Sequence, residues 1–259
     1  MSELALGVDI GGTKILTGLV APDGRVLRQW RTPTDASRGG PAVMEAVEQA
    51  LQGILTELPP DERPLGVGVC AAGQVDFATG RIAYASPNIP GWAGTPVKAR
   101  LETALGLPVT VDNDGNAAAY GEWWAGAGKG LGDIVMLTVG TGVGGGIVLG
   151  GEVLRGGRFR GGEVGHMILV ADGEPCNCGQ RGCLEVYASG TAIARLARQH
   201  MPGWEGAAPD VFELAAQGEA EADFVLANAA RNLALGLVSL GSVLDPDRFI
   251  VGGGVASAP

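Results

Sequence analysis

Positive charge is scarce in this sequence. Its 259 residues include 18 lysines and arginines against 28 aspartates and glutamates, and the formal net charge is −10. Nucleic acids and anionic membrane surfaces are bound through clustered basic side chains. The charge therefore argues against both as partners. A bound nucleotide would have to be held locally, by backbone amides, a lysine and a divalent cation.

Long uninterrupted apolar segments are also missing. The most apolar stretch, residues 134–150, is broken by six glycines and two threonines, which favours a strand–turn–strand over a membrane span. The N-terminus runs directly into a strand pattern and shows no signal peptide. The chain has only four cysteines, and three of them are clustered. We therefore expect a cytoplasmic protein with reduced thiols.

Glycine is abundant, and it falls mainly in short turns after apolar runs. Residues 4–10 and 15–20 are apolar runs on either side of Gly-Gly-Thr-Lys, and residues 134–138 and 146–149 flank a second Gly/Thr turn. A turn that leads into a second strand predicts a hairpin, whereas the glycines of a P-loop lead into a helix. The repeated pattern predicts two similar halves, each with a glycine turn.

These turns are candidate phosphate sites. Glycine lets backbone amides approach a phosphate closely, and a threonine hydroxyl adds a donor. Asp9, at the end of the first run, is placed to hold Mg²⁺ through water. A third turn near Gly253 could accommodate adenine or ribose against the backbone. The alternatives are ordinary tight turns and, for Gly253, a disordered terminus.

Apolar spacing predicts the other elements. Helices are expected at residues 40–58, 96–105, from about 117 to 124, 190–200 and 222–244, and further strands at residues 26–31, 65–70, 109–111 and 249–251. Residues 71–92 are expected to form a long loop with one short strand around Ile82. This loop carries Asn88 between two prolines, a placement that suits a polyol ligand or a simple surface turn.

Acid and amide side chains cluster where the strand at residues 109–111 ends. The sequence there is Asp112-Asn113-Asp114-Gly115-Asn116, immediately before a predicted helix. Such side chains at a strand's carboxyl end lie where α/β sheets bind ligands. They could also cap the helix, but a cap needs one such residue and this stretch has four. We therefore expect a site here, with Asp112 and Asp114 as competing carboxylates.

Three cysteines lie within eight positions, and one of the two histidines precedes them by ten residues. Three thiolates and one imidazole are the ligands of a closed tetrahedral zinc site, and nearby glycines allow the tight turns it needs. Free cysteines or a disulfide are the alternatives, and an odd cluster suits neither. The expected structural Zn²⁺ ligands are His166, Cys176, Cys178 and Cys183.

Together these motifs resemble the ROK family of sugar kinases, and within it the bacterial glucokinases. The matching stretches are DIGGTK at residues 9–14, VDNDGNAAAYGE at 111–122, TVGTGVGGG at 138–146, GGEVGH at 161–166, CNCGQRGCLE at 176–185 and VGGG at 251–254. The resemblance implies an α/β protein of the actin-like ATPase (ribonuclease H-like) fold, with two mixed-sheet lobes and a cleft between them. We expect the lobes at residues 1–118 and 119–259. Because the family continues past the last turn, we expect the second lobe to be truncated.

The resemblance also implies the residues' roles. Asp114 matches the family's catalytic base for transfer of the ATP γ-phosphoryl group to the glucose 6-hydroxyl. The implied sugar ligands are Asn88, Asn113, Asp114, Glu163, His166 and Glu185, and the implied nucleotide contacts are Asp9, Gly11, Gly12, Thr13, Lys14, Thr141, Gly142 and Gly253. ATP, Mg²⁺ and Zn²⁺ are the implied cofactors, and a homodimer or homotetramer is the implied assembly.

Several alternatives stay open within this family. The sugar could instead be N-acetylmannosamine, N-acetylglucosamine or fructose, and the phosphate donor could be polyphosphate. The family also includes sugar-responsive transcriptional repressors. These carry a helix-turn-helix ahead of the DIGGTK motif, for which we expect no room before Asp9.

Overall fold

The Gly-Gly-Thr-Lys turn joins two antiparallel strands, as the apolar runs on either side of it predict. The computed structural model describes residues 3–85 and 89–258, and in it β1 (Ala5–Ile10) pairs with β2 (Lys14–Val20) over the length of β1. The Gly11 amide donates to the Lys14 carbonyl over 3.0 Å and closes the turn. The predicted hairpin is therefore confirmed.

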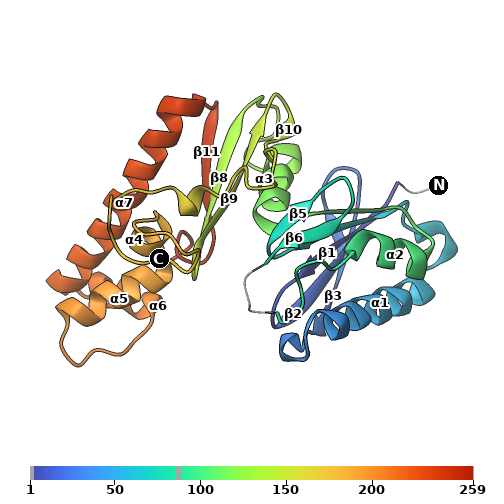
Figure 1. Cartoon of the computed structure of the whole chain (residues 1–259), viewed down its shortest axis with the longest axis horizontal. Helices are drawn as coiled ribbons and strands as arrows, with labels where there is room; N and C mark the ends of the chain where they lie inside the picture. Colours follow the sequence, from blue (N-terminus) through green and yellow to red (C-terminus); the bar gives the residue numbers. More distant parts are fainter. Residues whose placement is uncertain (1–2, 86–88, 259) are drawn as a thin grey trace. The chain divides into compact units, whose positions relative to one another are not determined.

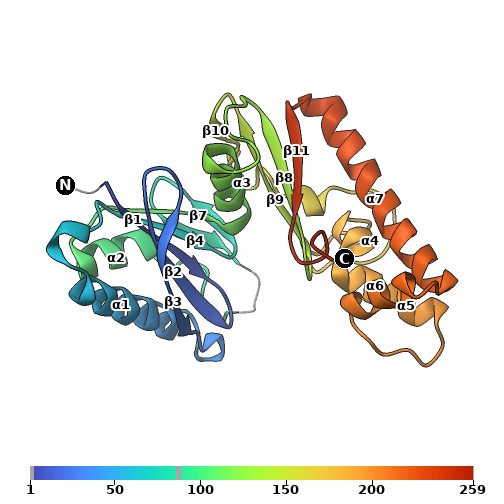
Figure 2. The ribbon, with the colours of Figure 1, turned by 180° about the vertical axis from the view of Figure 1, so that it is seen from behind.

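This hairpin supplies two strands of a five-stranded mixed sheet with the order β3-β2-β1-β4-β7. Its other strands are β3 (Val26–Pro33), β4 (Val67–Ala71) and β7 (Val109–Asn113), with β4 and β7 parallel to β1. Helices α1 (Gly40–Glu57) and α2 (Val97–Leu105) lie side by side along it (Figures 1 and 2). The predicted apolar stripe of α1, which includes Val43, Val47 and Leu51, is buried in the core of this sheet.

One local prediction in this part of the chain was incomplete and another was wrong. The short strand predicted around Ile82 is β6 (Arg81–Tyr84), and it pairs in a hairpin with β5 (Gln74–Asp76), which was not predicted. Helix α3 (Asp114–Ala125) begins at Asp114 and not near Ala117. The reason is that Asn113 caps the helix, so the acid and amide cluster lies partly inside its first turn.

A second, four-stranded mixed sheet repeats the arrangement of the first. It contains β8 (Ile134–Val139), β9 (Val143–Leu149), β10 (Glu152–Val153) and β11 (Arg248–Gly252), in the order β10-β9-β8-β11. Strand β8 is antiparallel to β9 across the second Gly/Thr turn and parallel to β11, just as β1 is antiparallel to β2 and parallel to β4. The predicted internal repeat is thus present in the topology.

Four helices accompany this second sheet: α4 (Glu185–Ala188), α5 (Gly190–His200), α6 (Ala208–Ala216) and α7 (Ala220–Leu244). Helix α6 was not predicted. Among the described helices, α7 alone has the length and mean hydropathy of a membrane span. Its apolar residues pack against two hydrophobic clusters; Leu240 is in one of them, and Val225 and Ala229 are in the other. Residues 36–38, 60–62 and 164–166 form short 3₁₀ turns.

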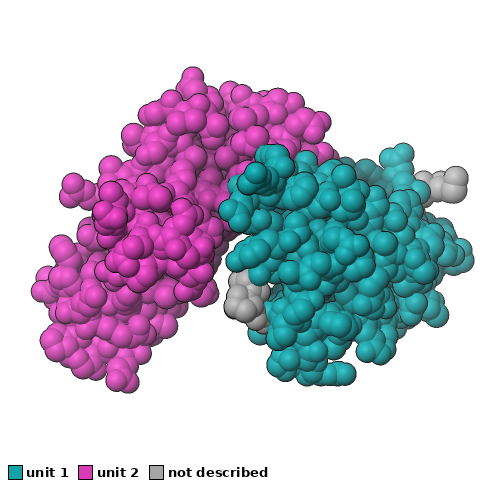
Figure 3. Space-filling view, viewed as in Figure 1, with its two compact units in different colours: residues 1–117, 155–160 teal, residues 118–154, 161–259 magenta. Residues whose placement is uncertain are grey.

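The chain divides into two compact units, which are coloured separately in Figure 3. Unit 1 comprises Met1–Ala117 together with Arg155–Arg160, and unit 2 comprises Ala118–Leu154 and Gly161–Pro259. Six residues from the middle of unit 2's sequence therefore belong to unit 1 by their contacts. We call this stretch, residues 155–160, the crossing segment.

Candidate active site and metal centre

Asp114 is held in one orientation at the junction of β7 and α3. Its Oδ1 accepts hydrogen bonds from the Asn113 side-chain amide and from the Gly115 backbone amide, both over 2.9 Å. Its Oδ2 accepts none from the residues that the structure describes. One carboxylate oxygen is thus anchored while the other remains open to a ligand, which is the geometry that a general base requires.

Asn113 positions this carboxylate and caps the helix at the same time. Its Oδ1 accepts from the Asn116 backbone amide over 3.1 Å, and its side-chain nitrogen donates to Asp114 and to the Gly73 carbonyl. The sequence left open whether this stretch caps a helix or forms a site, and Asn113 is arranged for both. For a sugar hydroxyl it retains a second lone pair on Oδ1.

The surroundings of Asp114 make its carboxylate a stronger proton acceptor. Asp114 has solvent-accessible surface, but the protein atoms around its carboxyl group displace part of the surrounding water, and this desolvation raises its pKa above the ordinary value for aspartate. The nearby negative charge of Asp9 raises the pKa of Asp114 further. The Gly115 amide opposes part of this shift. A carboxylate whose pKa is raised accepts a proton more readily than an ordinary one.

Asp112, the competing carboxylate, is fully engaged. Its Oδ2 accepts from Arg155 Nε and Nη2 over 2.9 and 2.7 Å, and its Oδ1 accepts from the Asn113 backbone and the Asn116 side chain over 2.8 and 3.1 Å. Only 14% of its side chain is exposed. A carboxylate with both oxygens occupied and a guanidinium beside it is a poor base. The geometry therefore favours Asp114.

Asp9 lies in the same row of residues as Asp112. The parallel pairing places Asp9 beside Cys70 on β4, and Cys70 beside Asp112 on β7. The Cys70 thiol donates to Asp9 Oδ1 over 3.6 Å. Burial and the Asp9 charge raise the pKa of this thiol to about 12, so it remains protonated at neutral pH. Cys70 is thus a partly buried free thiol that lies outside the cysteine–histidine cluster.

The first glycine turn presents open backbone. Gly12 and Thr13 are exposed, and a Cβ added to Gly12 would meet no atom within 4 Å. The turn is held from behind, where the Thr13 carbonyl accepts from the Thr34 amide over 3.1 Å. Gly11 and Lys14 are partly buried at its two ends. Exposed amides on a fixed turn are what a phosphate group needs.

The second glycine turn borders a cavity of about 430 Å³ in unit 2. The Gly140 and Thr141 carbonyls accept from the backbone amides of Gly190 and Thr191, which fixes the turn against the start of α5. The cavity is lined by this turn, α5, the start of α6 and the end of the chain, at Gly140, Thr141, Gly190, Thr191, Ala194, Arg198, Ala207, Ala208, Pro209, Phe212, Gly254, Val255 and Ala258. Apolar walls with a few polar groups suit a flat heteroaromatic ligand.

The predicted contact Gly253 is placed differently. The cavity is lined by Gly254, whereas Gly253 has a φ of +96° and packs against the backbone of Val139. A Cβ at Gly253 would lie 2.5 Å from the Val139 carbonyl oxygen. Gly253 therefore shapes this turn by allowing a close approach of two backbone segments.

Glu185 connects the second turn to the cysteine cluster. Its Oε2 accepts from the Val143 backbone amide over 3.0 Å, and its Oε1 lies 3.9 Å from the Cys176 sulfur. A Cβ on Gly142 would be only 2.3 Å from Glu185 Oε2, so the glycine leaves room for this carboxylate. Glu163 directly precedes the 3₁₀ turn that carries His166. Asn88 lies outside the described residues.

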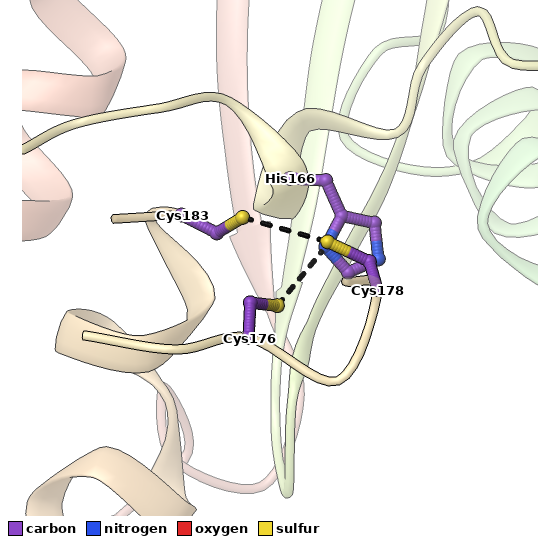
Figure 4. Close-up of side chains that lie close together, drawn as sticks. All are labelled: His166, Cys176, Cys178 and Cys183. Carbon is purple, nitrogen blue, oxygen red and sulfur yellow. Dashed lines mark hydrogen bonds between the residues drawn. The ribbon is translucent and has the colours of Figure 1, made fainter. Parts of the chain in front are cut away.

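The four predicted metal ligands come together in unit 2 (Figure 4). The ligand atoms of His166, Cys176, Cys178 and Cys183 all lie within 4.8 Å of one another. Cys178 and Cys183 sulfurs are 3.6 Å apart, and the Cys176 sulfur is 3.7 Å from His166 Nδ1. A disulfide would require an S–S distance of about 2.0 Å, so these separations exclude one.

The same separations fit zinc. With Zn–S bonds of about 2.3 Å and Zn–N bonds of about 2.0 Å, tetrahedral coordination places neighbouring ligand atoms roughly 3.6–3.8 Å apart. Burial raises the pKa of the Cys183 thiol to about 12, a cost that a divalent cation would offset by binding the thiolate. The loop is tightly turned at Gly182, where φ is +78° and an added Cβ would lie 1.7 Å from the Val170 carbonyl oxygen.

Some residues at these sites were not predicted from the sequence. Arg198 and Phe212 line the cavity, and Arg155 pairs with Asp112. The short apolar pattern of α6 offered a weak signal for Phe212. The two arginines had none, because an ion pair or cavity wall formed by residues distant in sequence leaves no local pattern.

Comparison with known proteins agrees with these features. The model of the ROK family matches residues 5–259. A glucokinase from Halalkalibacterium halodurans is 38% identical over 98% of this chain and 81% of its own length. A ROK hexokinase from Thermus thermophilus is 40% identical with a TM-score of 0.87, and the match covers 99% of this chain and 84% of that one. A ROK glucokinase from Streptomyces griseus, solved with glucose and AMPPNP, is 38% identical with a TM-score of 0.82, covering 98% of this chain and 84% of that one. The predicted α/β fold of actin-like ATPase type is confirmed by these structures.

Proposed function

Because the chain belongs to the ROK family, we propose that it is a glucokinase that transfers the γ-phosphoryl group of ATP to the 6-hydroxyl of glucose. The observation that carries this proposal is the Asp114 carboxylate, with one oxygen anchored, the other open and its pKa raised. Phosphoryl transfer needs little covalent chemistry from a protein, so one oriented base and positioned substrates suffice.

Asp114 would act as the general base. Its open Oδ2 accepts the proton of the glucose 6-hydroxyl as that oxygen forms its bond to the γ-phosphorus, and the bond from this phosphorus to the β–γ bridging oxygen breaks to release ADP. The products are glucose 6-phosphate and a protonated Asp114, which then returns its proton to solvent. Asn113 would keep Asp114 aligned and contact the sugar through its remaining lone pair.

Unit 2 would hold the adenosine part of ATP in the 430 Å³ cavity. Phe212, Pro209 and Val255 provide apolar surface for the adenine ring, and Thr141 and Gly142 lead from this cavity into a second one of about 410 Å³ that Glu185 also lines. We assign the phosphates to the second glycine turn, at Thr141 and Gly142, and to the first glycine turn, at Gly11, Gly12, Thr13 and Lys14. A Mg²⁺ ion, near Asp9, would neutralise phosphate charge.

The zinc loop would shape the sugar site. Zn²⁺ bound to four protein ligands supplies a rigid crosslink and no open coordination position. His166 Nδ1 is directed at the Cys176 sulfur. With Zn²⁺ bound at Nδ1, the other ring nitrogen, Nε2, would carry the hydrogen and would donate it to a sugar hydroxyl. Glu185 and Glu163 flank this loop and would accept hydrogen bonds from other hydroxyls, and Asn88 completes the proposed set.

Three further predictions remain part of this proposal. We expect a cytoplasmic protein, because ATP and reduced thiols are found together there. We also expect a homodimer or homotetramer. The net charge of −10 supports the expectation that neither nucleic acid nor membrane is a partner.

The proposal is tested by a coupled assay of the purified protein over a panel of sugars and donors. We expect ATP-dependent phosphorylation of glucose with a higher kcat/KM than of N-acetylmannosamine, N-acetylglucosamine or fructose, and with polyphosphate as the weaker donor. A preference for another hexose would retain the kinase and reassign its substrate. Absence of phosphorylation with every sugar and donor would contradict the proposal.

A further inference from the structure

We propose that Arg155 is a positioning residue for phosphoryl transfer, which holds the Asp112–Asn113–Asp114 turn in its working geometry from outside the strand that carries it. This inference rests on the proposed role of Asp114 as general base. It concerns a residue that lies 43 positions from Asp112 in the chain.

Arg155 is fixed by two kinds of contact. Its Nε and Nη2 both donate to Asp112 Oδ2, over 2.9 and 2.7 Å, and its guanidinium lies 3.6 Å from the centre of the Phe77 ring, in the turn between β5 and β6. Its side chain is 22% exposed. A guanidinium that is stacked on one face and paired at its edge has little freedom, which makes it a suitable anchor for a carboxylate.

The position of Arg155 in the fold supports this role. The crossing segment groups with unit 1 by its contacts, although Leu154 and Gly161 on either side of it belong to unit 2. Its two ends both contact unit 1, since Arg155 pairs with Asp112 and Arg160 Nε donates to Gln74 Oε1 over 3.3 Å. The crossing segment thus contacts the β5–β6 hairpin and the carboxyl end of β7.

Asp112 passes this restraint to the base. While its Oδ2 is held by Arg155, its Oδ1 accepts from the Asn113 backbone amide and from the buried Asn116 side chain in α3. The same Asn113 then donates from its side chain to Asp114 Oδ1. Arg155 is therefore connected to the base through two hydrogen-bonded residues.

Charge gives Arg155 a second effect on the base. Asp9, Asp112 and Asp114 lie at one edge of the sheet. The Cys70 thiol in the same row stays protonated and is therefore neutral. Arg155 is the cation paired with this group in the described residues. Without it, the Asp112 carboxylate would add an uncompensated negative charge beside Asp114, which would disfavour ionisation of the base.

The substitution R155M tests the inference, with R158M as its matched control. Both remove one positive charge from the crossing segment, but Arg158 is exposed and has no ion pair in the described residues. For R155M we expect kcat with glucose to fall by up to about 10²-fold, the loss that a 1 Å misplacement of a reacting group can cause. We expect KM for ATP to stay unchanged, because the cavity in unit 2 shares no residue with this network. R158M should match the wild type.

Two further measurements separate positioning from a general loss of structure. The acid limb of the kcat/KM pH profile should move to higher pH in R155M and not in R158M, because the uncompensated Asp112 raises the pKa of Asp114. In the double variant D112N/R155M, which removes the uncompensated charge without restoring the anchor, the limb should return while kcat stays low. In R155K, which supplies a cation at the same place, the limb and kcat should both recover in part. These two variants also keep the test decisive if R155M folds poorly.

The outcomes are distinguishable from those of the proposed function. If the wild type phosphorylates no sugar, the proposed function fails. If the wild type is active and R155M behaves like R158M, the inference about Arg155 is overturned. It is also overturned if R155M loses activity with an unmoved acid limb and R155K recovers none of that activity, since a general loss of structure would produce that result.

Discussion

The two glycine turns have the same topology and differ in what surrounds them. Each joins the central strand of a mixed sheet to an antiparallel neighbour, and each central strand is parallel to a later one. Behind the first turn, parallel strands place Asp9, Cys70 and Asp112 in one row, with Asp114 just beyond. Behind the second are the Glu185 carboxylate, the start of α5 and the 430 Å³ cavity.

The two halves of this repeated fold therefore carry different functional groups. The backbone of both turns offers amides to a phosphate. Among the described residues, the Asp114 carboxylate lies beside the first turn, whereas the 430 Å³ cavity and the cysteine–histidine cluster lie in the unit of the second. In both cases the distinguishing side chains come from elements outside the hairpin. Substitutions in the two turns should therefore have different consequences, and the following predictions use that difference.

Among the substitutions in unit 2, disrupting the metal cluster should have the largest effect. In C178S, zinc content should fall from one ion per chain to near zero, and KM for glucose should rise by about 10–10²-fold, because the loop that carries the sugar ligands loses its crosslink. Elemental analysis and steady-state kinetics measure both. C70S makes the same chemical change outside the cluster and should retain zinc. A zinc-free wild type, or a zinc-free C178S with normal glucose kinetics, would contradict the assignment.

A single methyl group should distinguish the two turns. In G142A the added Cβ would lie 2.3 Å from Glu185 Oε2, so the carboxylate must move and lose its bond to the Val143 amide. Hydrogen bonds to charged groups contribute about 1.5–3 kcal/mol, so we expect KM for glucose to rise by about 10–10²-fold.

The matched substitution in the first turn is G12A, whose Cβ meets no atom within 4 Å. It should leave KM for glucose unchanged and act only on the kinetics with ATP. Equal glucose kinetics in G12A and G142A would show that Glu185 takes no part in binding the sugar.

The pH dependence of the reaction should report the raised pKa of Asp114. The base works only when deprotonated, so kcat/KM should fall by up to about tenfold for each unit of pH below its pKa. Because burial and Asp9 raise that pKa, the fall should begin at higher pH than an ordinary aspartate would give. A kcat/KM that stays constant down to the pH range in which an ordinary aspartate titrates would argue against Asp114 as the base. The stability of the fold should be verified at each pH by circular dichroism.

The smallest expected effect concerns stability. A carboxyl group whose folded pKa is raised destabilises the fold at pH values above that pKa, and the penalty disappears below the unfolded pKa, where both states are protonated. D114N should therefore raise Tm slightly at neutral pH and not at low pH. The gain should not exceed a few degrees, because about 1 kcal/mol shifts Tm by roughly 2–4 °C in a chain of this size and Asp114 is partly screened by solvent. Calorimetry at two pH values measures it.

The sequence predicted the features that depend on neighbouring residues. Apolar runs around glycines predicted both hairpins, and the spacing of Cys176, Cys178 and Cys183 predicted a cluster because a short loop can bring them together. The short strand around Ile82 was predicted and is β6, but its partner β5, with three residues, was too short for its alternation to be recognised. The nine residues of α6 were missed for the same reason.

Other features depend on contacts between residues far apart in the chain. The pairing of Arg155 with Asp112 spans 43 positions, and no local pattern marks either residue as a partner. Gly253 and Gly254 are adjacent and look alike in the sequence. The structure distinguishes them, since Gly253 packs against Val139 and Gly254 lines the cavity. The residues alone left Asp112 and Asp114 as competing carboxylates. The family resemblance favoured Asp114, and the hydrogen bonds that occupy Asp112 support that choice.

The most direct test of the central claim is to measure turnover, glucose affinity and zinc content on one preparation of D114N. If unit 1 supplies the base and unit 2 supplies the metal-shaped part of the sugar site, kcat should fall by about 10²–10⁴-fold, while the glucose Kd by calorimetry stays within a few-fold of wild type and zinc remains at one ion per chain. A D114N protein that phosphorylates glucose at the wild-type rate would contradict the claim.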